Sequence, residues 1–136
     1  MSYRIIQNIL DDKLALVPDV PTIVKENIDK SNCVGSYYVR ATFMPAKTDT
    51  VSATETGFDR FKGLYQIDVM YPTNEGTDAS NYMADQIIAE FSKKDILSAN
   101  GISVRIVQHW RETATEYDTI LKTPVMIQWE TYILRS

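Results

Sequence analysis

Histidine and cysteine are nearly absent from the chain, which has one of each, His109 and Cys33. A single cysteine cannot form a disulfide within the chain, and these two residues lie too far apart in sequence for a zinc site of familiar spacing. A lone histidine beside Trp110 is more often a packed or surface residue than a catalytic base. We therefore expect no metal site, no cofactor and no catalytic residue in this chain.

Glycine is also scarce, and the five glycines are isolated from one another. No glycine-rich loop is available to bind phosphate, and the motifs GxSxG, HExxH and GxxxxGK[ST] do not occur. Two carboxylate pairs are present, Asp11 with Asp12 and Glu112 with Glu116. Both lie in polar surroundings at the ends of expected elements, where carboxylates are usually solvated, so we do not assign them acid–base roles.

Positive charge is sparse and scattered, with 14 basic against 18 acidic residues and a net charge of −4. A nucleic-acid-binding domain would show a basic stripe or a high pI, so this class is disfavoured. No run approaches the roughly 18 to 20 apolar residues that span a bilayer, and the N-terminus does not resemble a signal peptide. We expect a protein that is assembled in the cytosol and does not enter a membrane.

The spacing of apolar residues predicts two helices. The first covers residues 2–16 and the second residues 77–93, where Asp78 and Lys93 suit the two ends of the helix dipole. Val17-Pro18 ends the first helix, because proline cannot continue it. The apolar stripes of the two helices are Ile5, Ile6, Ile9, Leu10 and Leu14, and Ala84, Ile87, Ile88 and Phe91.

Alternation of period two predicts strands over residues 37–44, 61–71, 102–106 and 125–133, with a shorter strand at 22–26. Asn100-Gly101 is a hairpin signal before the third of these. Pro124 should begin the last strand or lie where its missing N–H is harmless. At 136 residues we expect a single α+β domain over residues 1–136, a mainly antiparallel twisted sheet with two helices packed on one face.

The sheet face opposite the expected core carries both polar and apolar side chains. Polar residues on it should be wet or covered by a partner, and apolar ones make it more apolar than a free surface requires. These side chains are Arg40, Gln66, Asp68, Gln128 and Glu130, and Tyr38, Met70, Met126 and Tyr132. Residues 45–60, rich in Thr and Asp, join two strands as a long loop, and loops of this length usually have a function.

Four segments together resemble the tail terminator-like proteins of long-tailed bacteriophages, a family once filed as a bacteriophage-related domain of unknown function. The resemblance covers residues 3 to 134, and its most specific segment is the second of the four. The sequence departs from the family at two places. Lys25 stands where family members commonly have a tryptophan, and residues 28–35 replace a proline-rich stretch. The segments are YVRATFMPA (Tyr38–Ala46), KGLYQIDVMYP (Lys62–Pro72), ADQIIAEF (Ala84–Phe91) and PVMIQW (Pro124–Trp129).

The resemblance implies a structural virion protein at the neck end of the tail. Such proteins assemble as a ring, usually a homohexamer, on the last ring of tail tube protein, stop tube polymerisation and offer a surface to the neck or connector. DNA passes through the ring without specific binding, and an acidic or neutral lumen would not retain it. Two alternatives stay open: a neck or head-closure protein of the same virion, and a small α+β enzyme or ligand-binding domain with a pocket between sheet and helices.

Partner contacts are expected mainly on the loop at about 45–60, because binding residues concentrate on loops held by a rigid scaffold. A polar loop that orders only on contact would also resist premature self-assembly. The loop candidates are Thr48, Thr50, Val51, Thr54, Phe58 and Arg60. The charges that we expect at contacts between ring subunits are Arg40, Asp68, Arg105 and Glu130.

Overall fold

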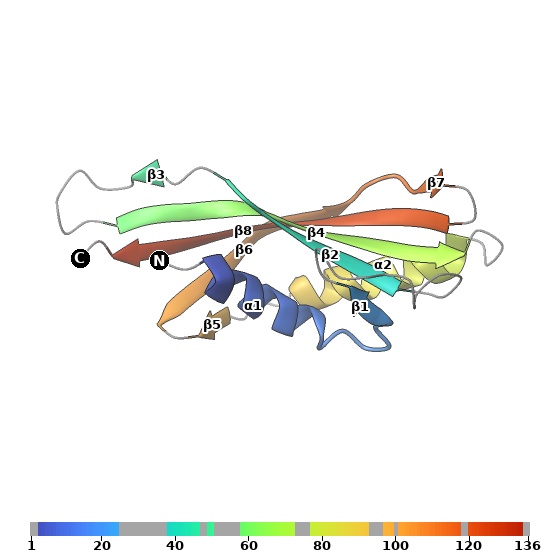
Figure 1. Ribbon diagram of the computed structural model, residues 1–136, viewed down its shortest axis with the longest axis horizontal. Helices are drawn as coiled ribbons and strands as arrows, with labels where there is room; N and C mark the ends of the chain where they lie inside the picture. The colour runs from blue at the N-terminus through green and yellow to red at the C-terminus, as the bar shows by residue number, and fades with distance from the viewer. Residues whose placement is uncertain are drawn as a thin grey trace.

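The computed structural model describes residues 3–24, 38–46, 49–50, 58–72, 77–92, 97–99, 101–117 and 120–134. Within these ranges the fold is α+β, as the sequence predicts, with two helices and a curled sheet (Figure 1). The elements in chain order are α1 (Tyr3–Leu14), β1 (Thr22–Val24), β2 (Tyr38–Pro45), β3 (Asp49–Thr50), β4 (Phe58–Pro72), α2 (Thr77–Phe91), β5 (Leu97–Ala99), β6 (Ile102–Arg111), β7 (Thr115–Tyr117) and β8 (Ile120–Leu134).

The strand order is β1-β2-β4-β8-β6-β5, with β3 added beside β4 and β7 beside β8. The β2–β4, β4–β8 and β6–β8 pairs are antiparallel, whereas β1 pairs with β2 in parallel. The sheet is therefore mixed, and the prediction of a mainly antiparallel sheet misses its parallel edge. Parallel neighbours need a long crossover connection, and the sequence pattern of residues 25–37 gave no sign of one.

The two central strands, β4 and β8, are 15 residues long and pair along their whole length, from Phe58 with Leu134 to Pro72 with Ile120. Both are longer than the sequence predicts. Polar residues such as Asp59 and Lys122 interrupt the apolar alternation near the strand ends, although the backbone ladder continues through them. Periodicity therefore located the apolar centre of each strand and missed the ends, where polar residues and Pro124 interrupt the pattern.

Pro124 lies inside β8 rather than at its start, opposite Asp68 of β4. Its carbonyl accepts the backbone N–H of Glu112 at 3.0 Å, so its nitrogen also faces the β6 and β7 side of the strand. On that side β6 pairs with residues of β8 as far as Val125, and β7 pairs with β8 only from Lys122 onward to Ile120. Pro124 lies between these two paired segments of β8, where its missing N–H removes no ladder bond. The second of the two predicted placements is therefore confirmed.

One hydrophobic core contains the apolar stripes of both helices and alternate residues of the central strands. Full burial of each such aliphatic or aromatic side chain contributes about 1.5–3 kcal/mol to stability. In the view of Figure 1 both helices lie below the sheet. The most buried members of this core include Ile6, Leu10, Leu14, Val39, Tyr65, Ile67, Val69, Ala84, Ile87, Phe91, Val125, Ile127 and Trp129.

The opposite face of the sheet is less open than predicted. Tyr38 and Met70 are only 5% and 7% exposed, because they form a second cluster with Val24, against which Ile120 packs. Met126 is also buried, and of the four apolar residues expected on this face only Tyr132 is strongly exposed. Three of the four apolar side chains expected on this face are therefore buried, and Tyr132 is the one of the four that adds exposed apolar surface to it.

Candidate partner-binding surfaces

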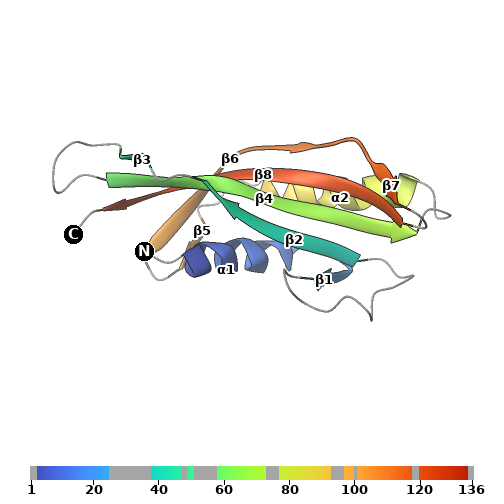
Figure 2. The same cartoon turned by 45° about the horizontal axis from the view of Figure 1, so that its top comes forward.

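The far ends of β4 and β8 form an arm together with β3. β2 pairs with β4 as far as Gly63, and beyond that residue β3 takes its place, with Asp49 opposite Arg60 and Thr50 opposite Asp59. In Figures 1 and 2 this part of the sheet extends past the start of α1. We call residues 49–50, 58–62 and 130–134 the arm.

Strand pairing thus reaches into the segment predicted as a loop. Thr50 and Phe58 lie in the strands of the arm, and Arg60 lies there half-buried. The other loop candidates, Thr48, Val51 and Thr54, lie outside the described residues. Thr50, Phe58 and Arg60 therefore belong to the arm, and the contacts of all six candidates with a partner stay a prediction.

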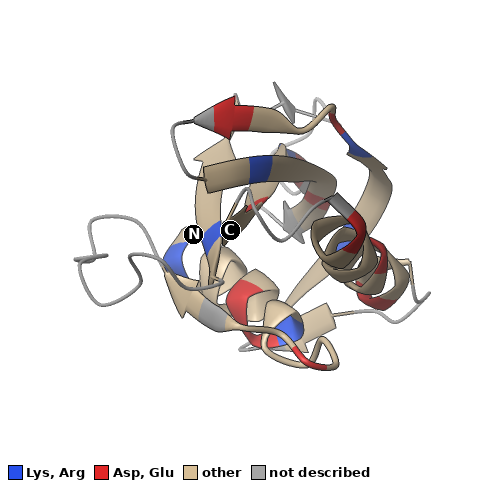
Figure 3. Cartoon of the chain, turned by 90° about the vertical axis from the view of Figure 1, so that its right-hand side faces the viewer, with Lys and Arg blue, Asp and Glu red and all other residues tan. Residues whose placement is uncertain are grey.

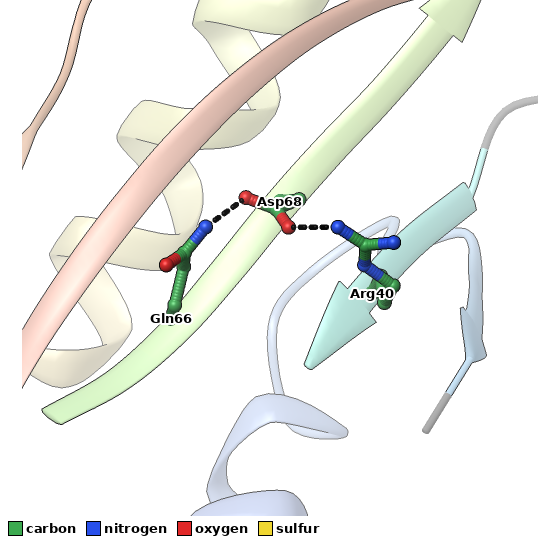
Figure 4. A network of polar contacts seen from close by, with 3 residues as sticks. All are labelled: Arg40, Gln66 and Asp68. Carbon is green, nitrogen blue, oxygen red and sulfur yellow. Dashed lines mark hydrogen bonds and ion pairs between the residues drawn. The ribbon is translucent and has the colours of Figure 1, made fainter. Parts of the chain in front are cut away.

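Arg40, Asp68 and Gln66 form a polar network across β2 and β4 (Figure 4). The Arg40 guanidinium donates Nη2–H to Asp68 Oδ2 at 3.0 Å, and the Gln66 amide donates to Asp68 Oδ1 at 2.7 Å. Asp68 is fully buried, whereas the Arg40 side chain is 31% exposed. Two charges that were expected to meet a neighbouring subunit are therefore paired with each other.

The other two charges expected at ring contacts are also paired within the chain. Arg105 of β6 donates to Glu130 of β8, and the neighbouring Gln108 donates to Gln128 at 2.7 Å. Glu130 is nearly buried, but the Arg105 side chain is 72% exposed. Of the four predicted interface charges, Arg105 thus retains the largest surface for contact with a partner.

β6 has an exposed stretch that the sequence analysis did not single out. Every residue from Val107 to Arg111 is exposed, including the large side chains of Val107 and Trp110. A register shift between Ile106 and Gln108 leaves Val107 without an opposite residue in β8, which is the pattern of a β-bulge. Because sequence alternation cannot tell an edge strand from a central one, only the strand order identifies this surface.

His109 contacts Ser92, with 2.9 Å between Nε2 and the serine Oγ. The hydroxyl of Ser92 donates its single proton to the Ile88 carbonyl at 2.6 Å, so the histidine ring is the donor to this serine. A nucleophilic serine would need the reverse arrangement, with its proton directed at the histidine. Both residues are exposed, and the pair joins the C-terminal end of α2, which Ser92 follows, to His109 of β6.

A surface hollow of about 540 Å³ lies beside α2. Its described lining includes the carboxylates of Asp19, Asp78 and Asp85 and the rings of Tyr71 and Tyr82. In the described part of the chain no group of three or more His, Cys, Asp or Glu residues is arranged to hold a metal ion. Neither of the described helices has the length and apolar character needed to cross a membrane.

Comparison with known proteins gives a family for this chain. A solved structure whose title states no function aligns with a TM-score of 0.73 and 22% identity over 96% of each chain, which at this identity shows a shared fold. No curated protein matches. Residues 5–129 match the family model described as phage tail terminator protein. The chain therefore belongs to the phage tail terminator family, a structural and non-enzymatic family of bacteriophage tail proteins.

Proposed function

We propose that this protein caps the tail tube as a ring, ends tube polymerisation and presents a surface for attachment of the neck and head. The observation that carries the proposal is the family match, which spans residues 5–129 and so nearly all of the fold. The partners are further copies of this chain in a homohexameric ring, the tail tube protein and a neck or connector protein. The site of action is the neck end of the tail.

The arm is the part of the fold best placed for the tube. It extends the two longest strands beyond α1, so a contact made at its end is transmitted along a continuous ladder into the core (Figure 2). We also infer that both helices pack on one face of the sheet, because their buried stripes share a single core with alternate strand residues. The opposite face and the sheet edges then remain for contacts with partners.

The charge distribution is compatible with passage of DNA. The net charge is −4, and Lys and Arg are interspersed with Asp and Glu in the end-on view rather than gathered on one face (Figure 3). Over the residues that the structure describes there is no basic stripe to neutralise successive phosphates (Figure 3). DNA would therefore move through the ring without specific binding, and no cofactor is required for this role.

Electron microscopy of tails from a phage with this gene interrupted tests the proposal. Tails of uncontrolled, excessive length are expected, because nothing would stop addition of tube rings. Restoring the gene from a plasmid should return the length to its normal value. Tails of normal length that fail to join heads would instead assign the protein to the neck, and normal infectious particles would refute both structural roles.

A further inference from the structure

Two strands of the sheet continue past the short strands that flank them. β5 pairs with β6 only from Ile102 to Val104, and β1 pairs with β2 only from Tyr38 to Arg40. In the described part of the chain, β6 then runs on to Arg111 at one side of the sheet and β2 runs on to Pro45 at the other. Extended edges of this kind are templates for pairing with another chain.

The two edge stretches lie at the same level across the sheet. Ala41 pairs with Ile67, Ile67 with Val125, and Val125 with Arg111, so one row joins both edges. The row that begins at Pro45 continues through Gly63 and Trp129 to Ile106. β2 from 41 to 45 and β6 from 106 to 111 therefore span the same rows, and the extra residue of β6 is accounted for by the bulge at Val107.

Their directions are also complementary. β2, β4, β8 and β6 alternate in direction, because each neighbouring pair is antiparallel. If a copy of the chain is placed beside another by rotation about an axis along the strands, β6 of the first runs antiparallel to β2 of the second. Antiparallel pairs are the commoner kind in sheets. The alternation would then continue unbroken from one copy to the next.

The backbone groups alternate in a compatible way. Glu112 donates its N–H to β8 at Pro124, so the N–H and C=O of the preceding Arg111 point away from β8. On the other side Ala46 donates its N–H to Lys62 of β4 at 2.7 Å, and by the same alternation Ala41 directs its N–H and C=O away from β4. Arg111 and Ala41, which end the same row, can therefore exchange both backbone hydrogen bonds across an interface.

We propose that copies of this chain pair head to tail through these edges, with residues 106–111 of β6 against residues 41–45 of β2 in the next copy. The inference rests on the ring that we propose above and specifies the surface that closes it. Each copy has one edge of each kind, so the contact is heterologous and closes as a ring when the rotation between copies allows. Thr42 and Trp110 also share one row and one face, so the exposed Trp110 would lie against Thr42 of the next copy.

Arg111→Pro tests the backbone contact. The substitution removes an N–H that points away from β8, and proline is tolerated at such edge positions, so the fold should persist. Arg111→Ala is the matched control, because both variants lose the 3.5 Å ion pair with Asp85 but the alanine keeps its N–H. Light scattering should give a multimeric mass for the wild type and for Arg111→Ala, and a shift to the 15.5 kDa monomer for Arg111→Pro. Measured on isolated monomers, the melting temperatures of Arg111→Ala and Arg111→Pro should be alike.

A wild-type chain that stays monomeric, or an Arg111→Pro variant that assembles as the wild type does, would overturn the inference. Disulfide trapping tests the register in the same protein. In a Cys33→Ser background, Trp110→Cys with Thr42→Cys should form a ladder of disulfide-linked multimers, because directly opposite residues of antiparallel strands lie within disulfide range. Trp110→Cys with Arg40→Cys, two residues out of register, should not.

The two proposals fail separately. If tails lacking this protein are overlong but Arg111→Pro and the cysteine pairs behave as the wild type does, the capping function stands and the edge contact is wrong. If the cysteine pair gives the ladder but interrupted phages have tails of normal length, the edge contact stands and the capping function is wrong.

Discussion

Lys13 and Glu90 form a buried ion pair between α1 and α2, with 3.1 Å between Nζ and Oε2 and both side chains only 5% exposed. Close by in the same helix, the Asp11 carboxylate accepts a hydrogen bond from the buried Tyr65 hydroxyl of β4. These contacts place charged groups of α1 inside the helix–sheet layer. They fix where α1 lies along α2 and β4, a position that apolar packing alone specifies less sharply.

Removing one partner of the Lys13–Glu90 pair should destabilise the fold. Glu90→Ala leaves the Lys13 ammonium buried without this carboxylate, which costs about 3 kcal/mol in the free energy of unfolding. The double variant Lys13→Met, Glu90→Leu replaces the pair by apolar groups of similar volume and should lie within about 1 kcal/mol of the wild type. Urea denaturation measures both, and equal losses in the single and double variants would contradict this account.

Gly63 is required by the Met44 backbone and the Trp129 ring, which both lie too close to leave room for a Cβ. A Cβ at this position would lie 2.4 Å from the Met44 carbonyl oxygen and 2.8 Å from Cζ2 of Trp129. The Trp129 ring cannot retreat easily, because it stacks on Phe43 with 5.3 Å between ring centroids. Gly63→Ala should therefore lower the free energy of unfolding by about 3 kcal/mol, as overpacking of a filled core does. Chemical denaturation and near-ultraviolet circular dichroism of the tryptophan report it.

Gly101 provides the matched control for Gly63. It has a φ of +80°, and a Cβ added there would meet nothing within 4 Å, so backbone strain is the sole penalty for a side chain at this position. Gly101→Ala should cost about 1 kcal/mol, and Gly101→Asn less, because asparagine adopts this conformation more readily. A loss at Gly101 as large as that at Gly63 would show that the close contacts around Gly63 are not the cause.

Arg40 should contribute to stability through the buried Asp68 carboxylate rather than only through contacts with a partner. Arg40→Met removes the 3.0 Å contact and leaves Asp68 with Gln66, so the free energy of unfolding should fall by about 2 kcal/mol. Adding Asp68→Leu should recover part of the loss, because the buried charge is then gone. Unfolding of the isolated monomer measures this, and an unchanged monomer with defective assembly would assign Arg40 to a subunit contact instead.

The sequence predicts the helices and strands of this fold better than it predicts which of them lie next to each other. Periodicity located both helices and the buried centres of β2, β4 and β8, because burial on one face imposes the repeat directly. It missed the parallel pairing of β1 with β2 and the two ion pairs, Arg40–Asp68 and Arg105–Glu130. Those features depend on which strands become neighbours, and no local pattern specifies that.

Of the candidate surfaces, the sequence predicts one and misses another. It predicts partner contacts on residues 45–60, and the structure places part of that segment in the arm. The exposed edge of β6 was not predicted, since the sequence predicts this strand only over residues 102–106, and Val107 and Trp110 lie beyond it. Edge position is a property of the assembled sheet, so the edge could be found only from the structure.

The connection at the end of the arm gives the last prediction. Replacing residues 51–57 by Asn-Gly keeps Thr50 and Asp59, which are paired in the arm. The melting temperature should change by no more than a few degrees, because loop length has a weak effect on stability. Capping should weaken, since Val51 and Thr54 are predicted contact residues. Tails assembled from purified tube protein with this variant should be longer, by electron microscopy, than those with the wild type. A seven-residue Gly-Ser replacement separates length from chemistry: if it caps normally, the side chains of this segment make no essential contact.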